Sequence, residues 1–301
     1  MTKRCRLSVS LFAAAILALA FVPPARAEMD HEQEPGAGWS PPSAAANQLE
    51  IQRATRIIQA DSPSRSALAV AYNDRGVARA ALGDNDGAIA DYGAAMVHEP
   101  RDAIYPNNRG NTRAKLDQCA AAIEDYNRAL ELDADYAIAL NNRGNCWMAL
   151  NAPARALADY DKAIALEPGY MLARYNRAYL FRESGEPARA IEDYTSVITL
   201  QPGFENAYIG RGQTYMLLGE EERAIQDFSA AIRLNPASYD AYFGRGEAYT
   251  VLGLRQSAAR DFDAAVRLKP AVPSASKEQR MRDAERRLLD LANKRRAAPQ
   301  S

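Results

Sequence analysis

The chain is poor in the side chains that most enzymes use for chemistry. It holds two histidines, His31 and His98, and three cysteines in 301 residues. No stretch has the glycine spacing of a phosphate-binding loop, the ligand spacing of a metal site or the motif of an activated nucleophile. This shortage argues against an enzyme, and we expect no catalytic residue, no cofactor and no metal.

An excess of positive charge is also missing. The chain has 37 Lys and Arg against 38 Asp and Glu. A protein that binds nucleic acid through its phosphates usually carries a basic surface. The charge balance therefore predicts no nucleic-acid partner.

An apolar run near the start of the chain has the features of a targeting segment. Lys3, Arg4 and Arg6 precede apolar residues 7–22, and small residues stand at both ends of the tripeptide 25–27. The run is shorter than the roughly twenty residues of a membrane span and ends at two prolines. We interpret residues 1–27 as a signal peptide cleaved after Ala27, which predicts a periplasmic or secreted protein with no transmembrane anchor after cleavage. A retained membrane anchor is the alternative.

Most of the remaining chain follows one repeat with a constant period of thirty-four positions. An Arg followed by a small residue recurs without insertion at Arg75-Gly76, Arg109-Gly110, Arg143-Gly144, Arg177-Ala178, Arg211-Gly212 and Arg245-Gly246. With the small residue as position 8, position 20 is Ala in all six copies and position 32 is Pro in five. Position 24 is a ring in every copy: Tyr92, Tyr126, Tyr160, Tyr194, Phe228 and Phe262. Small residues let two helices approach, rings fill the space beside them, and Pro ends a helix.

This pattern resembles the tetratricopeptide-repeat (TPR) family over residues 69–270. The resemblance implies an all-α fold, a right-handed superhelical solenoid of antiparallel helix pairs with six repeats in 69–270. It also implies a concave groove lined mainly by the first helix of each repeat. Because one fold carries many functions, the functional expectation is general. We expect a non-enzymatic scaffold that binds an extended peptide or a partner protein in this groove.

A second function remains open on the same features. The chain could be a structural assembly factor of the cell envelope that uses its convex face or its basic C-terminal helix. The sequence names neither the partner nor the oligomeric state.

Segments outside the six repeats are expected to lead into the array and to cap it. Residues 28–46 are rich in Pro, Gly and small polar residues and predict a flexible lead-in. Residues 47–68 should form an unpaired second helix and its connection, because Ala54 lies one period before Ala88. Residues 271–296 should form a C-terminal capping helix, followed by a tail at 297–301. Caps cover the core face that an end repeat would expose.

Arg at position 7 and Asp at position 23 recur in every repeat. We expect Asp91 to meet Arg109, and each later Asp to meet the Arg of the next repeat in the same way. Pairing within one repeat is the alternative geometry. A carboxylate partner offsets the cost of a guanidinium near a helix interface, so we favour a structural role for these pairs over a ligand-binding one.

Amides and rings occupy the positions that should line the groove. Amides are poor helix formers, and each can both donate to and accept from a peptide backbone. The eight candidates are Asn73, Asn107, Asn108, Asn111, Asn141, Asn142, Asn145 and Asn176. Asn108, Asn142 and Asn176 look like part of the asparagine ladder in the repeats of O-GlcNAc transferase, although Asp74, Gly210 and Gly244 interrupt the ladder here. The alternative is that these amides only solvate a helix face.

Three aromatic residues are the further groove candidates, and all three lie in the second half of the array. They are Tyr175, Tyr179 and Phe243.

Two cysteines remain after the expected cleavage. Cys119 should lie near the start of a second helix and Cys146 in the first helix of the next repeat, so the two helices should be neighbours. A disulfide requires Cα atoms within about 7 Å of each other. A bridge and two buried free thiols both remain open.

Overall fold

The computed structural model of the chain describes residues 42–268. The expected signal peptide, most of the lead-in, the C-terminal capping helix and the tail lie outside the described residues. The chain divides into two units, Met1–Pro168 and Gly169–Ser301, and each unit is described by itself.

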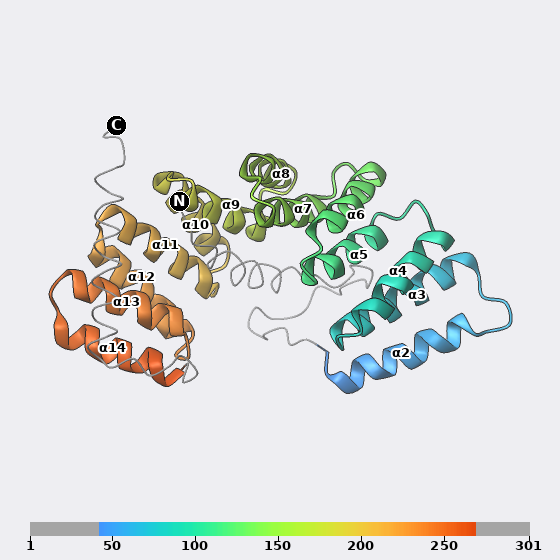
Figure 1. The fold of residues 1–301 in the computed structure, drawn as a ribbon, viewed down its shortest axis with the longest axis horizontal. Coiled ribbons are helices and arrows are strands. Elements are labelled where there is room, and N and C mark those ends of the chain that lie inside the picture. The colour runs from blue at the N-terminus through green and yellow to red at the C-terminus, as the bar shows by residue number, and fades with distance from the viewer. Residues whose placement is uncertain (1–41, 269–301) are drawn as a thin grey trace, which may run out of the picture. The chain divides into compact units, whose positions relative to one another are not determined.

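The described residues form thirteen α-helices and no strand, which confirms the all-α prediction. The helices of the first unit are α2 (Ala44–Ile58), α3 (Arg65–Ala81), α4 (Asn85–His98), α5 (Ile104–Lys115), α6 (Cys119–Leu132), α7 (Ala137–Ala149) and α8 (Pro153–Leu166). Those of the second unit are α9 (Met171–Glu183), α10 (Pro187–Leu200), α11 (Glu205–Leu218), α12 (Glu221–Leu234), α13 (Tyr239–Val251) and α14 (Arg255–Leu268). Figure 1 follows them along the chain.

Helix pairs stack in chain order within each unit. In the first unit, α3 packs on α4 of its own repeat and on α2 before it, and it also touches the next first helix, α5. The second unit repeats the pattern, because α11 packs on α10, α12 and α13. Each repeat therefore buries its apolar face against its neighbours, which is how a helical solenoid is stabilised.

The core is built where the ring at position 24 meets the small residue at position 8. Tyr126 and Tyr160 are fully buried. A Cβ atom on Gly144 would lie only 2.6 Å from Cε1 of Tyr160, so the helix needs glycine there for the ring to fit. The constant period thus reproduces one tight ring-to-backbone contact in successive repeats.

The two helices of each pair are joined by a tight turn in which one residue has a positive φ. Glycine fills this position in four repeats, and Asp117 and Asn151 fill it in the other two. Both of these residue types tolerate the left-handed conformation better than most. Second helices end shortly before the proline at position 32, yet α6 ends at the equivalent Leu132 where that position is Ala134. Proline therefore reinforces a helix end that the neighbouring helices already impose.

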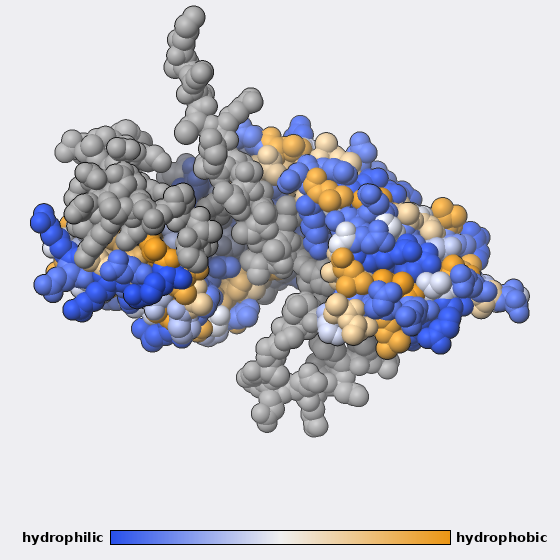
Figure 2. All heavy atoms as spheres, turned by 60° about the horizontal axis from the view of Figure 1, so that its bottom comes forward, coloured by the Kyte–Doolittle hydropathy of each residue, from blue (hydrophilic) through white to orange (hydrophobic). Residues whose placement is uncertain are grey.

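The visible face of the molecule in Figure 2 carries apolar residues in small patches among hydrophilic ones. Scattered apolar exposure of this kind is normal for a folded protein. Among the described residues, no helix combines the length and apolar character that crossing a membrane requires.

Candidate functional site

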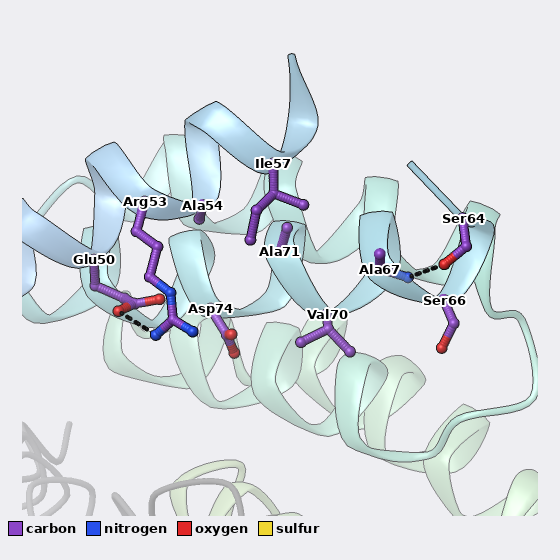
Figure 3. A pocket seen from close by; sticks show the side chains of 10 residues that line it. All are labelled: Glu50, Arg53, Ala54, Ile57, Ser64, Ser66, Ala67, Val70, Ala71 and Asp74. Atoms are coloured by element: carbon purple, nitrogen blue, oxygen red, sulfur yellow. Dashed lines mark hydrogen bonds and ion pairs between the residues drawn. The ribbon is translucent and has the colours of Figure 1, made fainter. Parts of the chain in front are cut away.

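A pocket of about 360 Å³ opens between α2 and α3 at the front of the first unit (Figure 3). Glu50, Arg53 and Ile57 of α2 line one wall, and Val70 and Asp74 of α3 line the other. The walls combine apolar surface with two carboxylates. None of these residues was among the groove residues expected from the sequence.

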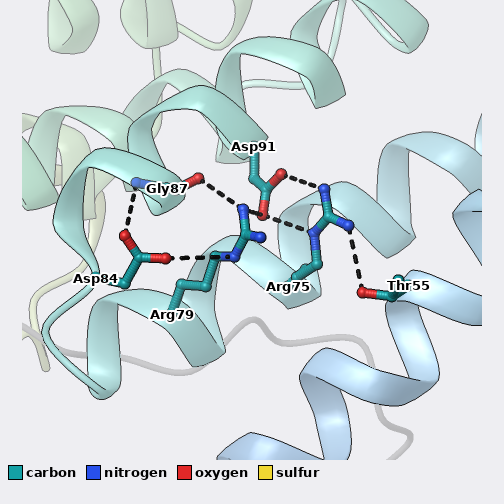
Figure 4. Close-up of polar contacts among 6 residues, drawn as sticks. All are labelled: Thr55, Arg75, Arg79, Asp84, Gly87 and Asp91. Atoms are coloured by element: carbon teal, nitrogen blue, oxygen red, sulfur yellow. Dashed lines mark hydrogen bonds and ion pairs between the residues drawn. The ribbon is translucent and has the colours of Figure 1, made fainter.

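The recurring Arg and Asp residues form ion pairs within each repeat. Nε and Nη2 of Arg75 donate to the two carboxylate oxygens of Asp91 at 2.9 and 2.7 Å (Figure 4). All six repeats contain this pair, with closest nitrogen-to-oxygen distances of 2.6–2.8 Å. The prediction that Asp91 meets Arg109 of the next repeat is therefore wrong, and the alternative geometry is confirmed. Positions 7 and 23 face each other because the two helices of one pair are antiparallel.

A second arginine joins the carboxylate in the first two repeats. Arg79 and Arg113, at position 11, each place Nη1 2.9 Å from the Asp of their own repeat. These Asp side chains are only 4% and 2% exposed. A buried carboxylate that already accepts two or more charge-assisted hydrogen bonds holds helices together and has little capacity left to bind a ligand. The pairs are structural parts of the fold.

Position 11 is aromatic in the later repeats, and arginines lie over its ring. Phe181 has the Cζ of Arg177 at 5.6 Å and that of Arg189 at 3.8 Å from its ring centroid. Tyr215 has Arg211 at 6.0 Å and Arg223 at 4.4 Å. A cation over a ring face replaces the second ion pair of the first repeats.

The asparagines connect successive first helices of the first unit. Nδ2 of Asn108 donates to Oδ1 of Asn73 at 3.0 Å, and Nδ2 of Asn142 donates to Oδ1 of Asn107 at 3.2 Å. Nδ2 of Asn142 also lies 2.9 Å from Oδ1 of Asn111. We call the eight asparagines predicted above the amide row. Except for Asn145, its members in α3, α5 and α7 form a continuous hydrogen-bonded network.

Most of the amide row is shielded from solvent. Only Asn108 and Asn111 are half-buried. The other six members are buried: Asn73, Asn107, Asn141, Asn142, Asn145 and Asn176. These six side chains therefore do not lie on a fully solvated helix face, which was the alternative interpretation of the asparagines. Their burial also means that many of the amides help to pack one first helix against the next.

Position 9 amides have a second role that the sequence analysis missed. The hydroxyl of Tyr126 donates to Oδ1 of Asn111 at 2.8 Å, and that of Tyr160 donates to Oδ1 of Asn145 at 2.7 Å. Burial raises the pKa of Tyr126 well above its usual value, so its hydroxyl stays protonated and donates. These bonds occupy the amide oxygens only. Nδ2 of Asn145 is buried and has no hydrogen-bond partner among the described residues.

The first repeat lacks this pairing, because its position 9 is Val77. The fourth repeat also lacks it. Its position 9 is Tyr179 and not an amide, and the buried hydroxyl of Tyr194 has no hydrogen-bond partner within the described chain. In the fifth and sixth repeats position 9 is Gln213 and Glu247, and the ring is Phe228 or Phe262, which needs no partner. In the sequence, Tyr at position 24 occurs together with Asn at position 9 in the second and third repeats only, and this coincidence could have been found there.

The three predicted groove rings of the second unit mostly pack against other rings. Tyr175 makes edge contacts with Tyr194 at 5.8 Å and Phe204 at 5.3 Å between ring centroids. Phe243 lies 5.4 Å from Phe262. Tyr179 instead faces the guanidinium of Arg182, whose Cζ lies 4.9 Å from its ring centroid. The structure therefore places Tyr175 and Phe243 in packing contacts and Tyr179 beside a cation.

Cys119 and Cys146 are neighbours, as expected, and both are buried free thiols. They share a core cluster with Ala114, Ile123 and Tyr126. A hydrogen bond between the two sulfurs lowers the pKa of Cys119, while the same bond and burial raise the pKa of Cys146. A disulfide between them stays a prediction.

Comparison with known proteins agrees with the stacked helix pairs. The family described as TPR repeat matches residues 110–150 and 212–253. Two families described as tetratricopeptide repeat match residues 137–170 and 173–204. No curated protein matches the chain.

Solved structures share the same fold. MamA is 25% identical, with a TM-score of 0.50 over 54% of this chain and 94% of MamA. YrrB, described as a TPR protein with an unusual peptide-binding site, is 21% identical, with a TM-score of 0.52 over 65% of this chain and 97% of YrrB. PilF of Pseudomonas aeruginosa is 20% identical, with a TM-score of 0.64 over 73% of this chain and 99% of PilF.

The repeat pattern, the helix pairs stacked in chain order, the matching families and the similar structures lead to the same assignment. The chain contains tetratricopeptide repeats, which the family models match within residues 110–253.

Proposed function

We propose that this chain is a non-enzymatic scaffold that binds an extended peptide or a partner protein along its first helices. The fold supports an interaction scaffold, because tetratricopeptide repeats generally act as interaction modules. YrrB, which has the same fold, is described by its peptide-binding site. The finer part of the proposal concerns where on this chain the peptide binds.

The observation that carries the proposal is the unused Nδ2 donor of the position 9 amide Asn145. Oδ1 of Asn145 accepts from Tyr160, but its Nδ2 is buried without a partner among the described residues. A buried donor left unsatisfied costs about 1–3 kcal/mol. A carbonyl oxygen of a bound peptide would recover this cost after a rotation of the Asn145 side chain brings Nδ2 to the surface. Asn111, on the preceding first helix, uses its oxygen in the same way and is half-buried.

Such donors suit a ligand that is recognised by its backbone. A primary amide donates to a peptide carbonyl whatever the side chain of that residue. The hydrogen bonds within the amide row hold α3, α5 and α7 in register, which fixes the spacing of these helices before a peptide arrives. Preorganisation of this kind improves affinity because fewer groups have to be ordered on binding.

The test removes the donor without leaving a new unpaired group. A peptide is selected from a display library of random unstructured sequences with the wild-type chain. Its Kd is then measured by fluorescence anisotropy for a variant carrying Asn145→Ala together with Tyr160→Phe. The second change removes the hydroxyl that Asn145 accepts from and copies the ring of the fifth and sixth repeats. We expect Kd to rise about fivefold to tenfold, the value of one hydrogen bond.

Tyr160→Phe alone is the matched control, because it keeps the amide and should leave Kd within about twofold. Equal affinities of all three proteins would refute peptide binding through Asn145. Failure to select any peptide with the wild-type chain would count against the peptide-binding function itself.

We also propose that the chain is exported and works in the periplasm or outside the cell. The basic start, the apolar run and the small residues before Glu28 support this proposal. Expression of the full sequence in a bacterium followed by intact mass measurement tests it. A mature protein beginning at Glu28 is expected, whereas a chain that retains residues 1–27 would contradict it.

A further inference from the structure

The pocket between α2 and α3 lies at a particular place in the repeat. Ala54 and Ile57 of α2 stand one period before Ala88 and Asp91 of α4. In the first repeat α3 packs against α4, and Arg75 of α3 contacts Asp91. α2 is a second helix with no first helix of its own among the described residues. The pocket therefore marks the place that such a first helix would occupy.

Asp74 on the opposite wall leads to the same conclusion. It stands at position 6, where Asn108 and Asn142 reach back to an amide of the preceding first helix. No first helix precedes α3 in the described part of the chain, so the carboxylate of Asp74 faces the pocket and accepts only from the neighbouring Asn73. Burial raises the pKa of Asp74, as expected for a carboxylate with few donors around it.

The wall formed by α2 lacks the acidic residue that every complete repeat carries at the equivalent position. Every complete repeat has Asp at position 23, paired with the Arg at position 7 of its first helix. Ile57 stands at this position in α2 and is 36% exposed, and Val70 across the pocket is 47% exposed. A helix that bound here would need an apolar residue in place of the Arg.

The charges of the pocket restrict the ligand further. Glu50 and Asp74 contribute two carboxylates, whereas Arg53 is the one cation among the lining residues and lies 3.6 Å from Glu50. An amide or a cation on the ligand would satisfy Asp74, and a carboxylate would be repelled by it.

We propose that the pocket binds one amphipathic helix of a partner protein, which takes the place of the missing first helix. This partner helix carries an apolar residue against Ile57 and an amide or a cationic residue against Asp74. The site rests on the proposed role as an interaction scaffold but not on the donors of Asn111 and Asn145.

The test uses two synthetic helices built on the sequence of residues 137–150, stapled on the side that faces away from the protein. Both peptides carry Asn141→Lys, which places a cation opposite Asp74. One peptide also carries Arg143→Leu and the other keeps Arg143. Fluorescence anisotropy against the full chain should show binding of the leucine peptide at least about fivefold tighter than that of the arginine peptide.

The matched variant exchanges this preference. Ile57→Asp restores the position 23 residue of the other repeats, so the arginine peptide should become the tighter ligand by about fivefold. Because Ile57 is exposed, the variant should keep the circular dichroism spectrum of the wild type. Val70→Lys, a second variant, should weaken both peptides, because it removes apolar surface from the pocket and places a cation near the lysine that both peptides carry. Absence of binding to the wild type, or an unchanged preference in Ile57→Asp, would overturn the proposal.

Two other occupants of the pocket are distinguishable. If the peptides bind only after residues 28–41 are deleted, the chain's own lead-in fills the pocket. If a photoreactive residue at Val70 crosslinks two copies of the chain at micromolar concentration, the occupant is a second copy. Either result would overturn the partner-helix proposal. The peptide selected for the Asn145 test should bind equally well to Ile57→Asp, so the failure of one site is separable from the failure of the other.

Discussion

The first and second units share one helix-pair frame but satisfy their polar groups differently. In the first unit, amides connect α3, α5 and α7, and Asp91 and Asp125 each accept from two arginines. Rings occupy position 11 from the third repeat onward, and so throughout the second unit, where arginines lie over Phe181 and Tyr215. The comparison shows that positions 8, 20 and 24 define the repeat, while positions 5, 6, 9 and 11 vary without disturbing it.

The largest expected difference concerns the paired carboxylates. Asp125→Ala leaves both Arg109 and Arg113 without their carboxylate, whereas Asp227→Ala leaves only Arg211. Removing one partner of a buried ion pair costs about 3–5 kcal/mol, and the arginines here are partly solvated. We expect the free energy of unfolding in urea to fall by about 3 kcal/mol for Asp125→Ala and by about 2 kcal/mol for Asp227→Ala.

Asp135→Ala is the control for this comparison, because Asp135 is exposed and its change should stay within about 0.5 kcal/mol. Equal losses for Asp125→Ala and Asp227→Ala would show that the second arginine contributes nothing and that the two units are alike in this respect.

The next difference is covalent, since only the first unit has a pair of cysteines. Oxidised glutathione should convert the Cys119 and Cys146 thiols into a disulfide. The protein gives up two electrons and two protons, which reduce the glutathione disulfide to two thiols. Cys119 should react first, because the hydrogen bond from Cys146 lowers its pKa. The bridge should stabilise the first unit by about 2 kcal/mol.

Intact mass and urea unfolding before and after oxidation measure both effects. Cys146→Ala provides the control, because it leaves Cys119 with no intramolecular partner. An oxidised wild type that carries glutathione on one sulfur instead of an internal bridge would contradict this prediction.

The smallest difference concerns single hydroxyls. Tyr126→Phe removes a hydrogen bond to Asn111 and should destabilise the protein by about 1 kcal/mol. Tyr194→Phe removes a buried hydroxyl that has no partner within the described chain and should stabilise the protein by about 1 kcal/mol. The two changes are chemically identical, so opposite signs in urea unfolding would isolate the effect of the position 9 amide. The same sign for both would show that Tyr194 has a partner in solution.

Much of the fold was predictable because its determinants repeat. The spacing of Gly144 and Tyr160 recurs in four other repeats, with Ala178 in place of the glycine in the remaining one, and the helix pairs stack as this spacing predicted. The Arg and Asp pairing was not decided by the pattern. Asp91 lies almost midway between Arg75 and Arg109 in the sequence, and either partner fits an antiparallel stack. The contact between the two helices of one pair decides which Arg each Asp meets. The repeat period alone does not predict this contact, because it does not show which face of a helix is turned inward.

The candidate site was less predictable for a related reason. Asn108 and Asn142 share a repeat position and a residue type, yet Asn108 is half-buried and Asn142 is buried. The exposure of each asparagine depends on the side chains of the next first helix. These side chains vary between repeats, whereas positions 8, 20 and 24 do not. The pocket beside α2 was not predicted at all. It arises where the described chain has no first helix to pair with α2.

Each arginine at position 7 pairs with the aspartate of its own repeat, so the charges of this ion pair are balanced within every repeat. Gain or loss of a whole repeat then leaves every one of these arginines paired, whereas pairing across junctions would leave one Arg unpaired at the front of the array and one Asp unpaired at its end. The array can therefore change length in units of one repeat without a charge penalty.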